Sequence, residues 1–124
     1  MIFPRVARLA GVLLAAASLL PAQTQPSAPK NPKASAYYHA ALGHLYAELA
    51  AQYGGRGEYV SKAIENYKIA MREDPETASL AQDLSDLYLQ SGQIRTAVTE
   101  FEDFVKKSPD DVNARRILAR LYTA

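Results

Sequence analysis

The chain has 124 residues, with 14 Lys and Arg against 13 Asp and Glu, two His, and no Cys or Trp. This length allows one small domain, and the formal net charge of +1 argues against a strongly basic nucleic-acid binder. The absence of Cys excludes a disulfide framework, a thiolate metal site and a Cys nucleophile.

Residues 1–22 are predicted to be a secretory signal peptide. Arg5 and Arg8 precede an uncharged apolar run over residues 9–20, which ends at Pro21-Ala22. Twelve helical residues span about 18 Å, less than the roughly 30 Å hydrocarbon core of a bilayer. We therefore expect cleavage after Ala22, no stable membrane insertion afterwards, and a periplasmic or extracellular location. A permanent anchor and a buried N-terminal helix are the alternatives.

Residues 23–34 are predicted to be an extended linker. Pro26, Pro29 and Pro32 recur at every third position among mostly polar residues, and the segment has almost nothing apolar to bury. Such Pro-rich segments favour the polyproline II conformation and act as semi-rigid spacers. Removal of residues 1–22 leaves 12 basic and 13 acidic residues in the other 102 positions, so the mature chain carries a net charge of −1.

Residues 35–124 are predicted to form one all-α domain, because their apolar residues follow helical spacing and show no strand alternation. Gly54-Gly55 and Ser91-Gly92 are expected to end two helices with a left-handed residue. Asp74-Pro75 and Ser108-Pro109 are expected to cap and begin the helices that follow them. The five expected helices cover residues 35–53, 58–73, 76–91, 93–107 and 110–123.

Two patterns repeat within this domain. The pattern Leu, small, polar, Leu, Tyr begins at Leu42, Leu84 and Leu118. The pattern Ala-Ile-x-x-Tyr-x-x-Ala over residues 63–70 returns 34 residues later as Ala-Val-x-x-Phe-x-x-Phe over residues 97–104, and each copy is followed by Pro. The spacings place these residues on facing stripes of paired helices, with a small Ala opposite a small residue and an aromatic ring one turn further on. The residues expected to pack there are Leu42, Gly43, Tyr46, Ala63, Tyr67, Ala70, Leu84, Tyr88, Ala97, Phe101, Leu118, Ala119 and Tyr122.

A 34-residue helix-turn-helix unit with these residues resembles the tetratricopeptide repeat, here of an exported bacterial type. The resemblance implies a solenoid of about two and a half repeats, at 36–77, 78–111 and 112–124, after the N-terminal signal helix. Two departures stand out. The first unit has eight extra residues, expected as one more turn on each helix and a longer glycine-rich loop. Phe104 stands where the first unit has the small Ala70.

No residue set indicates catalysis, a cofactor or a metal, so we expect no enzyme. His39 and His44 are five residues apart on a helix and cannot share a metal, although His44 with Glu48 has a spacing that could hold an ion. The pairs Asp83 with Asp86 and Glu100 with Asp103 lack any sign of the burial that separates carboxyl pKa values. The glycine-rich stretch at 54–57 lacks the strand and the Lys-Ser/Thr of a phosphate loop.

The resemblance implies a groove, lined by the first helix of each unit, that holds a protein or peptide ligand whose identity the sequence does not give. Arg116 and Arg120, four residues apart, could bind a carboxylate or remain solvated. A longer array, self-association through the last helix, and attachment to a catalytic domain elsewhere are the alternatives. The residues expected on the groove face are Tyr37, Ala40, His44, Glu48, Gln82, Asp86, Leu89, Gln90, Asn113, Arg116 and Arg120.

Overall fold

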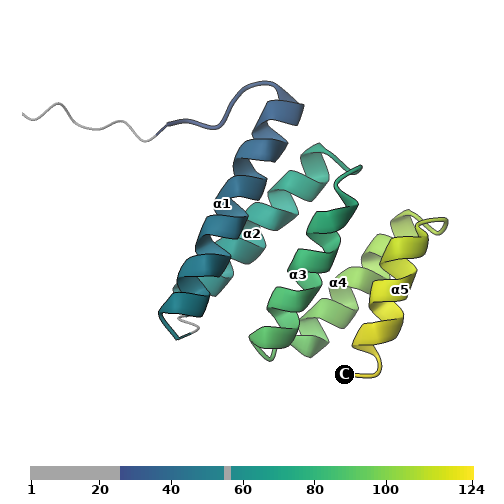
Figure 1. Ribbon diagram of the computed structural model, residues 1–124. Helices are drawn as coiled ribbons and strands as arrows, with labels where there is room; N and C mark the ends of the chain where they lie inside the picture. Colours follow the sequence, from purple (N-terminus) through teal and green to yellow (C-terminus); the bar gives the residue numbers. More distant parts are fainter. Residues whose placement is uncertain (1–25, 55–56) are drawn as a thin grey trace, which may run out of the picture.

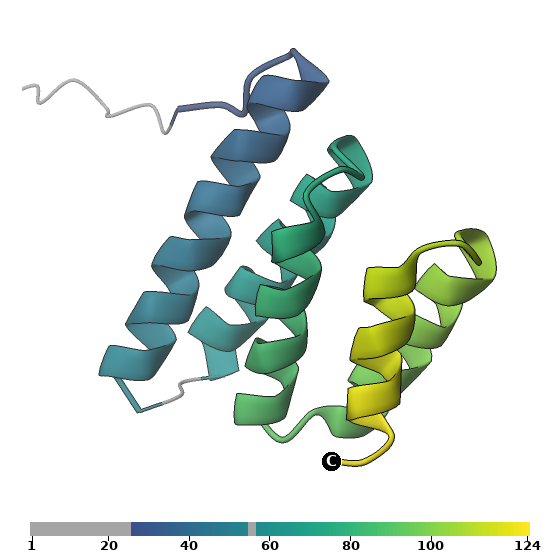
Figure 2. The ribbon, with the colours of Figure 1, turned by 45° about the vertical axis from the view of Figure 1, so that its right-hand side comes forward.

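The computed structural model describes residues 26–54 and 57–124, which form five helices and no strand. These helices are α1 (Pro32–Gln52), α2 (Gly57–Glu73), α3 (Ala78–Gln90), α4 (Ile94–Lys107) and α5 (Val112–Leu121). They form two antiparallel pairs followed by α5, with α1, α3 and α5 in one layer and α2 and α4 in a second (Figures 1 and 2). The predicted all-α arrangement is confirmed. The predicted signal peptide lies outside the described residues.

None of the described helices is both long and apolar enough to cross a membrane.

Two glycines end the first helix of each pair, as predicted. Gly54 and Gly92 have φ angles of 73° and 72°, a region that costs other residues free energy. After α3, the N–H of Gln93 donates to the carbonyl of Tyr88 and the N–H of Gly92 donates to the carbonyl of Leu89. These two bonds make a Schellman motif, which satisfies carbonyls that the end of the helix leaves unpaired.

The first helix begins at Pro32, three residues earlier than predicted. The side chain of Asn31 accepts hydrogen bonds from the N–H groups of Lys33 and Ala34 and so caps the helix. Proline is favoured at the first helical position because its missing N–H would have no partner there. Pro32 therefore belongs to α1, and the linker as described spans residues 26–31.

Helices α3 and α5 begin two residues later than predicted, at 78 and 112. The prediction that Asp74 and Ser108 cap these helices is wrong. Asp74 instead accepts a hydrogen bond from the N–H of Glu76 in a turn that precedes α3. Asp111 caps α5 by accepting from the N–H of Ala114.

The extra residues of the first unit are distributed as predicted. Helix α1 continues ten residues past Leu42, whereas α3 continues six past Leu84. Helix α2 has six residues before Ala63, whereas α4 has three before Ala97. Four residues separate α1 from α2, one more than separate α3 from α4. The first helical pair therefore has about one turn on each helix that the second pair lacks.

The predicted stripes form the hydrophobic core. Ala63, Ala70, Leu84, Ala97 and Phe101 are fully buried, and Tyr67, Tyr88 and Leu118 are also buried. Phe104, in place of a small residue, is half-buried and packs edge-on against Phe101 with the ring centroids 5.3 Å apart. This aromatic pair is the rearranged contact at the position that Ala70 occupies in the first unit.

Gly43 determines how closely α1 approaches α2. A Cβ atom built at Gly43 would lie only 2.5 Å from Cδ1 of Tyr67, so the contact exists because Gly43 has no side chain. The prediction that a small residue here lets the partner helix approach closely is confirmed, but the residue opposite Gly43 is the aromatic Tyr67 and not the small Ala that was predicted.

Packing differs from the prediction at the two ends of the array. Ala119 is exposed and Tyr122 is 60% exposed, whereas the equivalent Ser85 and Tyr88 of α3 are buried. The predicted burial of Ala119 and Tyr122 is wrong because no described helix follows α5 to cover them. Leu42 and Tyr46 are only half-buried for the matching reason that no described helix precedes α1.

Gly43→Ala is expected to destabilise the fold by about 1–3 kcal/mol, the usual cost of overpacking, although alanine is the better helix former by about 1 kcal/mol. Gly57→Ala in α2 is the matched control, because a Cβ atom added at Gly57 would have nothing within 4 Å of it. The control should be neutral or slightly stabilising. Urea unfolding of both variants measures the difference. Equal unfolding midpoints would show that the Tyr67 ring moves aside at little cost.

Candidate functional site

A groove lies between α1 and α3, with α2 beneath it. Six residues from these three helices enclose about 220 Å³. We call this hollow the α1–α3 groove. Asp86 and Gln90 were predicted on the groove face, and the other lining residues were not. The lining residues are Ala47, Tyr67, Asp83, Asp86, Leu87 and Gln90.

A chain of polar contacts crosses this groove from α2 over α1 to α3. The hydroxyl oxygen of Tyr67 and Nδ1 of His44 form a 2.9 Å hydrogen bond, and the two rings meet edge to face. Nε2 of His44 lies 3.9 Å from Oδ2 of Asp83. The ion-binding pair of His44 with Glu48 is not formed, because Glu48 instead accepts a hydrogen bond from Gln52.

Burial of Tyr67 raises the pKa of its hydroxyl to about 12, and the negative charge of Asp83 contributes in the same direction. The hydroxyl therefore stays protonated at neutral pH. The negative charge of Asp83 therefore acts on the Tyr67 hydroxyl at the floor of the groove.

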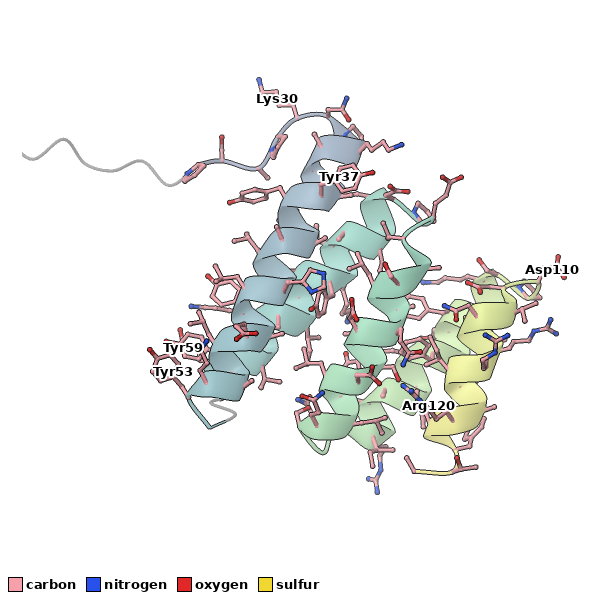
Figure 3. The ribbon with its side chains drawn as sticks, in the orientation of Figure 1. Lys30, Tyr37, Tyr53, Tyr59, Asp110 and Arg120 are labelled. Atoms are coloured by element: carbon pink, nitrogen blue, oxygen red, sulfur yellow. The ribbon has the colours of Figure 1, made fainter. Side chains whose placement is uncertain are left out.

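Arg120 joins α5 to α3. Its Nη2 donates to Oδ1 of Asp86 at 2.7 Å and to Oγ of Ser85 at 3.0 Å. Gln82 donates to both carboxylate oxygens of the same Asp86. Figure 3 shows Arg120 between the two helices. Because Arg120 is engaged within the chain, it does not act together with Arg116 as the carboxylate clamp considered from the sequence.

The remaining predicted groove residues are dispersed. Asn113 donates to the carbonyl of Ala78 and so forms a second tie between α5 and α3. Arg116 is exposed on α5, and Leu89 packs in part against the core. Tyr37 is 61% exposed near the first turns of α1 (Figure 3). None of these positions lines the α1–α3 groove.

Sequence reasoning missed the groove roles of Asp83, Ser85 and the Tyr67 hydroxyl. It considered Asp83 only as half of a carboxylate pair and the other two only as packing residues. A signal was present for Asp83, because it lies three residues before Asp86 and therefore on a similar side of the helix. For Ser85 and Tyr67 the signal is absent, since their partners come from other helices.

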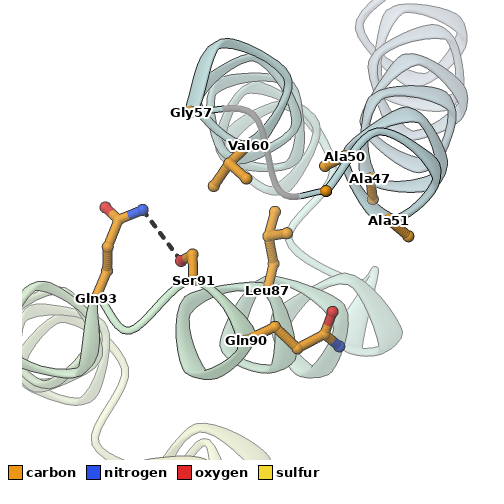
Figure 4. Close-up of a pocket in the computed structure, with 10 residues that line it drawn as sticks. Ala47, Ala50, Ala51, Gly57, Val60, Leu87, Gln90, Ser91 and Gln93 are labelled. Carbon is orange, nitrogen blue, oxygen red and sulfur yellow. Dashed lines mark hydrogen bonds between the residues drawn. The ribbon is translucent and has the colours of Figure 1, made fainter.

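A second hollow of about 590 Å³ adjoins the groove at the end of the first helical pair. We call it the end cleft (Figure 4). Alanine, valine and leucine side chains line it together with polar side chains, and Nε2 of Gln93 donates to Oγ of Ser91. It shares Ala47, Leu87 and Gln90 with the α1–α3 groove, so the two hollows adjoin. The lining residues are Ala47, Ala50, Ala51, Gly54, Gly57, Val60, Leu87, Gln90, Ser91 and Gln93.

The carboxylates considered as catalytic pairs have separate partners. Asp83 faces His44 and Asp86 binds Arg120, while Glu100 binds Lys68 and accepts a hydrogen bond from Tyr88. Within the part of the chain that the structure describes, no group of three or more His, Cys, Asp or Glu residues could hold a metal ion. The polar contacts of this site join helices to one another.

A family model described as tetratricopeptide repeat matches residues 60–123, which is more than half of the chain. The matched segment runs from the first turn of α2 past the end of α5. No curated protein and no solved structure matches the chain.

In the Tyr67→Phe variant, the free energy of unfolding is expected to fall less steeply with rising alkaline pH than in the wild type. The folded-state pKa of about 12 exceeds the ordinary value of 10.0. The folded state therefore holds this proton more tightly, and the associated stability is complete below pH 10 and is lost as the pH rises towards about 12. Urea unfolding at several pH values from 9 to about 12 measures the slope of the free energy of unfolding against pH.

The slope decides this test, because loss of the hydrogen bond to His44 also lowers stability at every pH, by about 1 kcal/mol. Tyr37→Phe, at an exposed position of α1, is the control and should keep the wild-type slope. An unchanged slope in Tyr67→Phe would contradict the assignment.

Proposed function

The chain belongs to the tetratricopeptide repeat family, and from this we propose that it is a scaffold that binds a protein or peptide in the α1–α3 groove and catalyses no reaction. The observation that carries the proposal is a hollow built from three helices, with Tyr67 at its floor, hydrogen-bonded to His44, and a side wall at Asp83 and Asp86. Groove docking of this kind takes affinity from a few apolar anchors and orientation from polar groups.

The groove is suited to binding because its walls are already joined together. Contacts from His44 to Asp83, from Asp86 to Arg120 and from Asn113 to Ala78 connect α1, α3 and α5. A surface held in place before binding loses less conformational entropy when a ligand arrives. The half-exposed ion pair of Asp86 with Arg120 adds little stability, so the main effect of these contacts is on the relative position of the helices.

The absence of catalysis is supported by the same contacts. General acid–base chemistry by two carboxyl groups requires environments that separate their pKa values. In the groove, Asp83 and Asp86 each face a basic side chain from another helix. Each carboxylate therefore lies beside a partner on another helix, an arrangement that suits recognition of a ligand.

A photo-crosslinking amino acid at Gln90 is expected to capture discrete partner proteins in cells that naturally make this chain. Gln90 is exposed and lines the groove. Thr99 on α4, also exposed, is the matched control and should give no such adducts. Denaturing gels followed by mass spectrometry measure the adducts. Equal labelling from both positions, or none from either, would overturn groove binding.

We also propose that the chain is exported and cleaved after Ala22. The support is the sequence of residues 1–22, with two Arg before an uncharged apolar run and a small residue at its end. Export to a periplasmic or extracellular space would bring the groove into contact with partners outside the cytoplasm.

The mass of the chain recovered from the periplasmic or extracellular fraction is expected to correspond to a start at Gln23. Leu14→Asp should abolish this processing, because a charge in the apolar run opposes recognition as a signal. Leu45→Asp, which places the same charge on an exposed position of α1, should leave processing intact. Recovery of the wild-type chain at full length in the cytoplasm would refute export.

A further inference from the structure

We propose that the end cleft is the anchor site for the apolar side chain of an extended partner segment, which also places a basic residue beside Asp83. The inference rests on the proposed groove function and names the ligand class that the groove accepts. It combines the shape of the end cleft, its position next to the α1–α3 groove, and the position of one carboxylate.

The end cleft exists because the first helical pair is longer than the second. The extra turn of α1 supplies Ala50 and Ala51, and the extra turn of α2 supplies Gly57. Small side chains on these turns leave a volume of about 590 Å³ facing Leu87 of α3 (Figure 4). Ligand sites usually enclose roughly 300–1,000 Å³, so the cleft has room for at least one large apolar side chain.

The walls of the cleft favour an apolar occupant. Alanine, valine and leucine side chains line it, and two of its polar side chains, Ser91 and Gln93, bond to each other. Removal of apolar area from water contributes about 25 cal/mol per Å². A leucine, methionine or phenylalanine side chain from a partner would gain this contribution against the apolar part of the lining.

Charge complementarity predicts which residue of the partner segment lies near its apolar anchor. Asp83 lies in the adjoining groove with its side chain 39% exposed, and its distance of 3.9 Å from His44 is too long for a hydrogen bond. Asp86, by contrast, already binds Arg120 and Gln82. A lysine or arginine is therefore the complementary residue beside Asp83.

The spacing of Asp83 and Leu87 sets the spacing within the ligand. The two residues are four positions apart on α3, which is about 6 Å along the helix axis. An extended peptide advances about 3.3 Å per residue. The basic residue and the apolar anchor should therefore be two positions apart, in a basic-x-apolar pattern.

Selection of a phage-displayed library of random dodecapeptides on the full chain tests this inference. Selected peptides are expected to share the basic-x-apolar pattern. Ala51→Trp and Gln90→Trp fill the cleft from opposite walls at exposed positions and should weaken binding of these peptides at least tenfold. Thr99→Trp on α4 is the matched control and should leave binding unchanged. Fluorescence anisotropy with labelled synthetic copies measures affinity.

Asp83→Asn tests the charge contact separately. It should weaken peptides that carry the basic residue, and it should have little effect on the same peptides with that residue replaced by glutamine. Equal loss for both peptides would contradict the pairing with Asp83.

The outcomes separate the inference from the proposed function. Peptides whose binding survives both tryptophan variants but is lost in Asp86→Lys would leave groove binding intact and overturn the cleft as anchor site. Specific adducts from the crosslinker at Gln90 without any selected peptide of the predicted pattern would overturn the ligand class alone. Absence of both would overturn the two proposals together.

Discussion

The contact between Gly43 and Tyr67 is the constraint on which the first half of the structure depends. With no side chain on Gly43, the ring of Tyr67 lies directly under α1, where any Cβ would be 2.5 Å from the ring. That position brings the Tyr67 hydroxyl to His44, and His44 in turn faces Asp83 on α3. One packing requirement between two helices therefore also builds the floor of the groove and places its polar groups.

The same sequence position has different environments along the array, because each unit packs only on its neighbours. Leu87 is buried between the first and second units, whereas Leu45, its equivalent in α1, is 52% exposed. Tyr88 is buried and hydrogen-bonded to Glu100, whereas the equivalent Tyr122 is exposed and bonds Glu102 at the surface. A repeat motif thus describes what a residue can pack against, and its burial depends on whether a neighbouring helix is present.

The lengthened first unit shows how a small change in a repeat produces a site. Units of equal length would place the turns of both helical pairs at the same level, and neighbouring helices would cover one another. About one additional turn on α1 and α2 leaves Ala50, Ala51 and Gly57 without a full counterpart on the second pair. The end cleft follows from this mismatch, and it adjoins the groove at Ala47, Leu87 and Gln90, which line both.

Residue order was enough to predict the five helices, their pairing, the left-handed glycines at 54 and 92, and the buried stripes at Ala63, Tyr67, Ala97 and Phe101. These features depend on spacing within a helix and on the preferences of single residues, which are local properties. The packing of the helices against one another was needed to establish that Arg120 binds Asp86, that His44 faces Asp83 rather than Glu48, and that Tyr122 remains exposed. These outcomes depend on the distances and relative rotations between helices, which residue spacing along one helix does not specify.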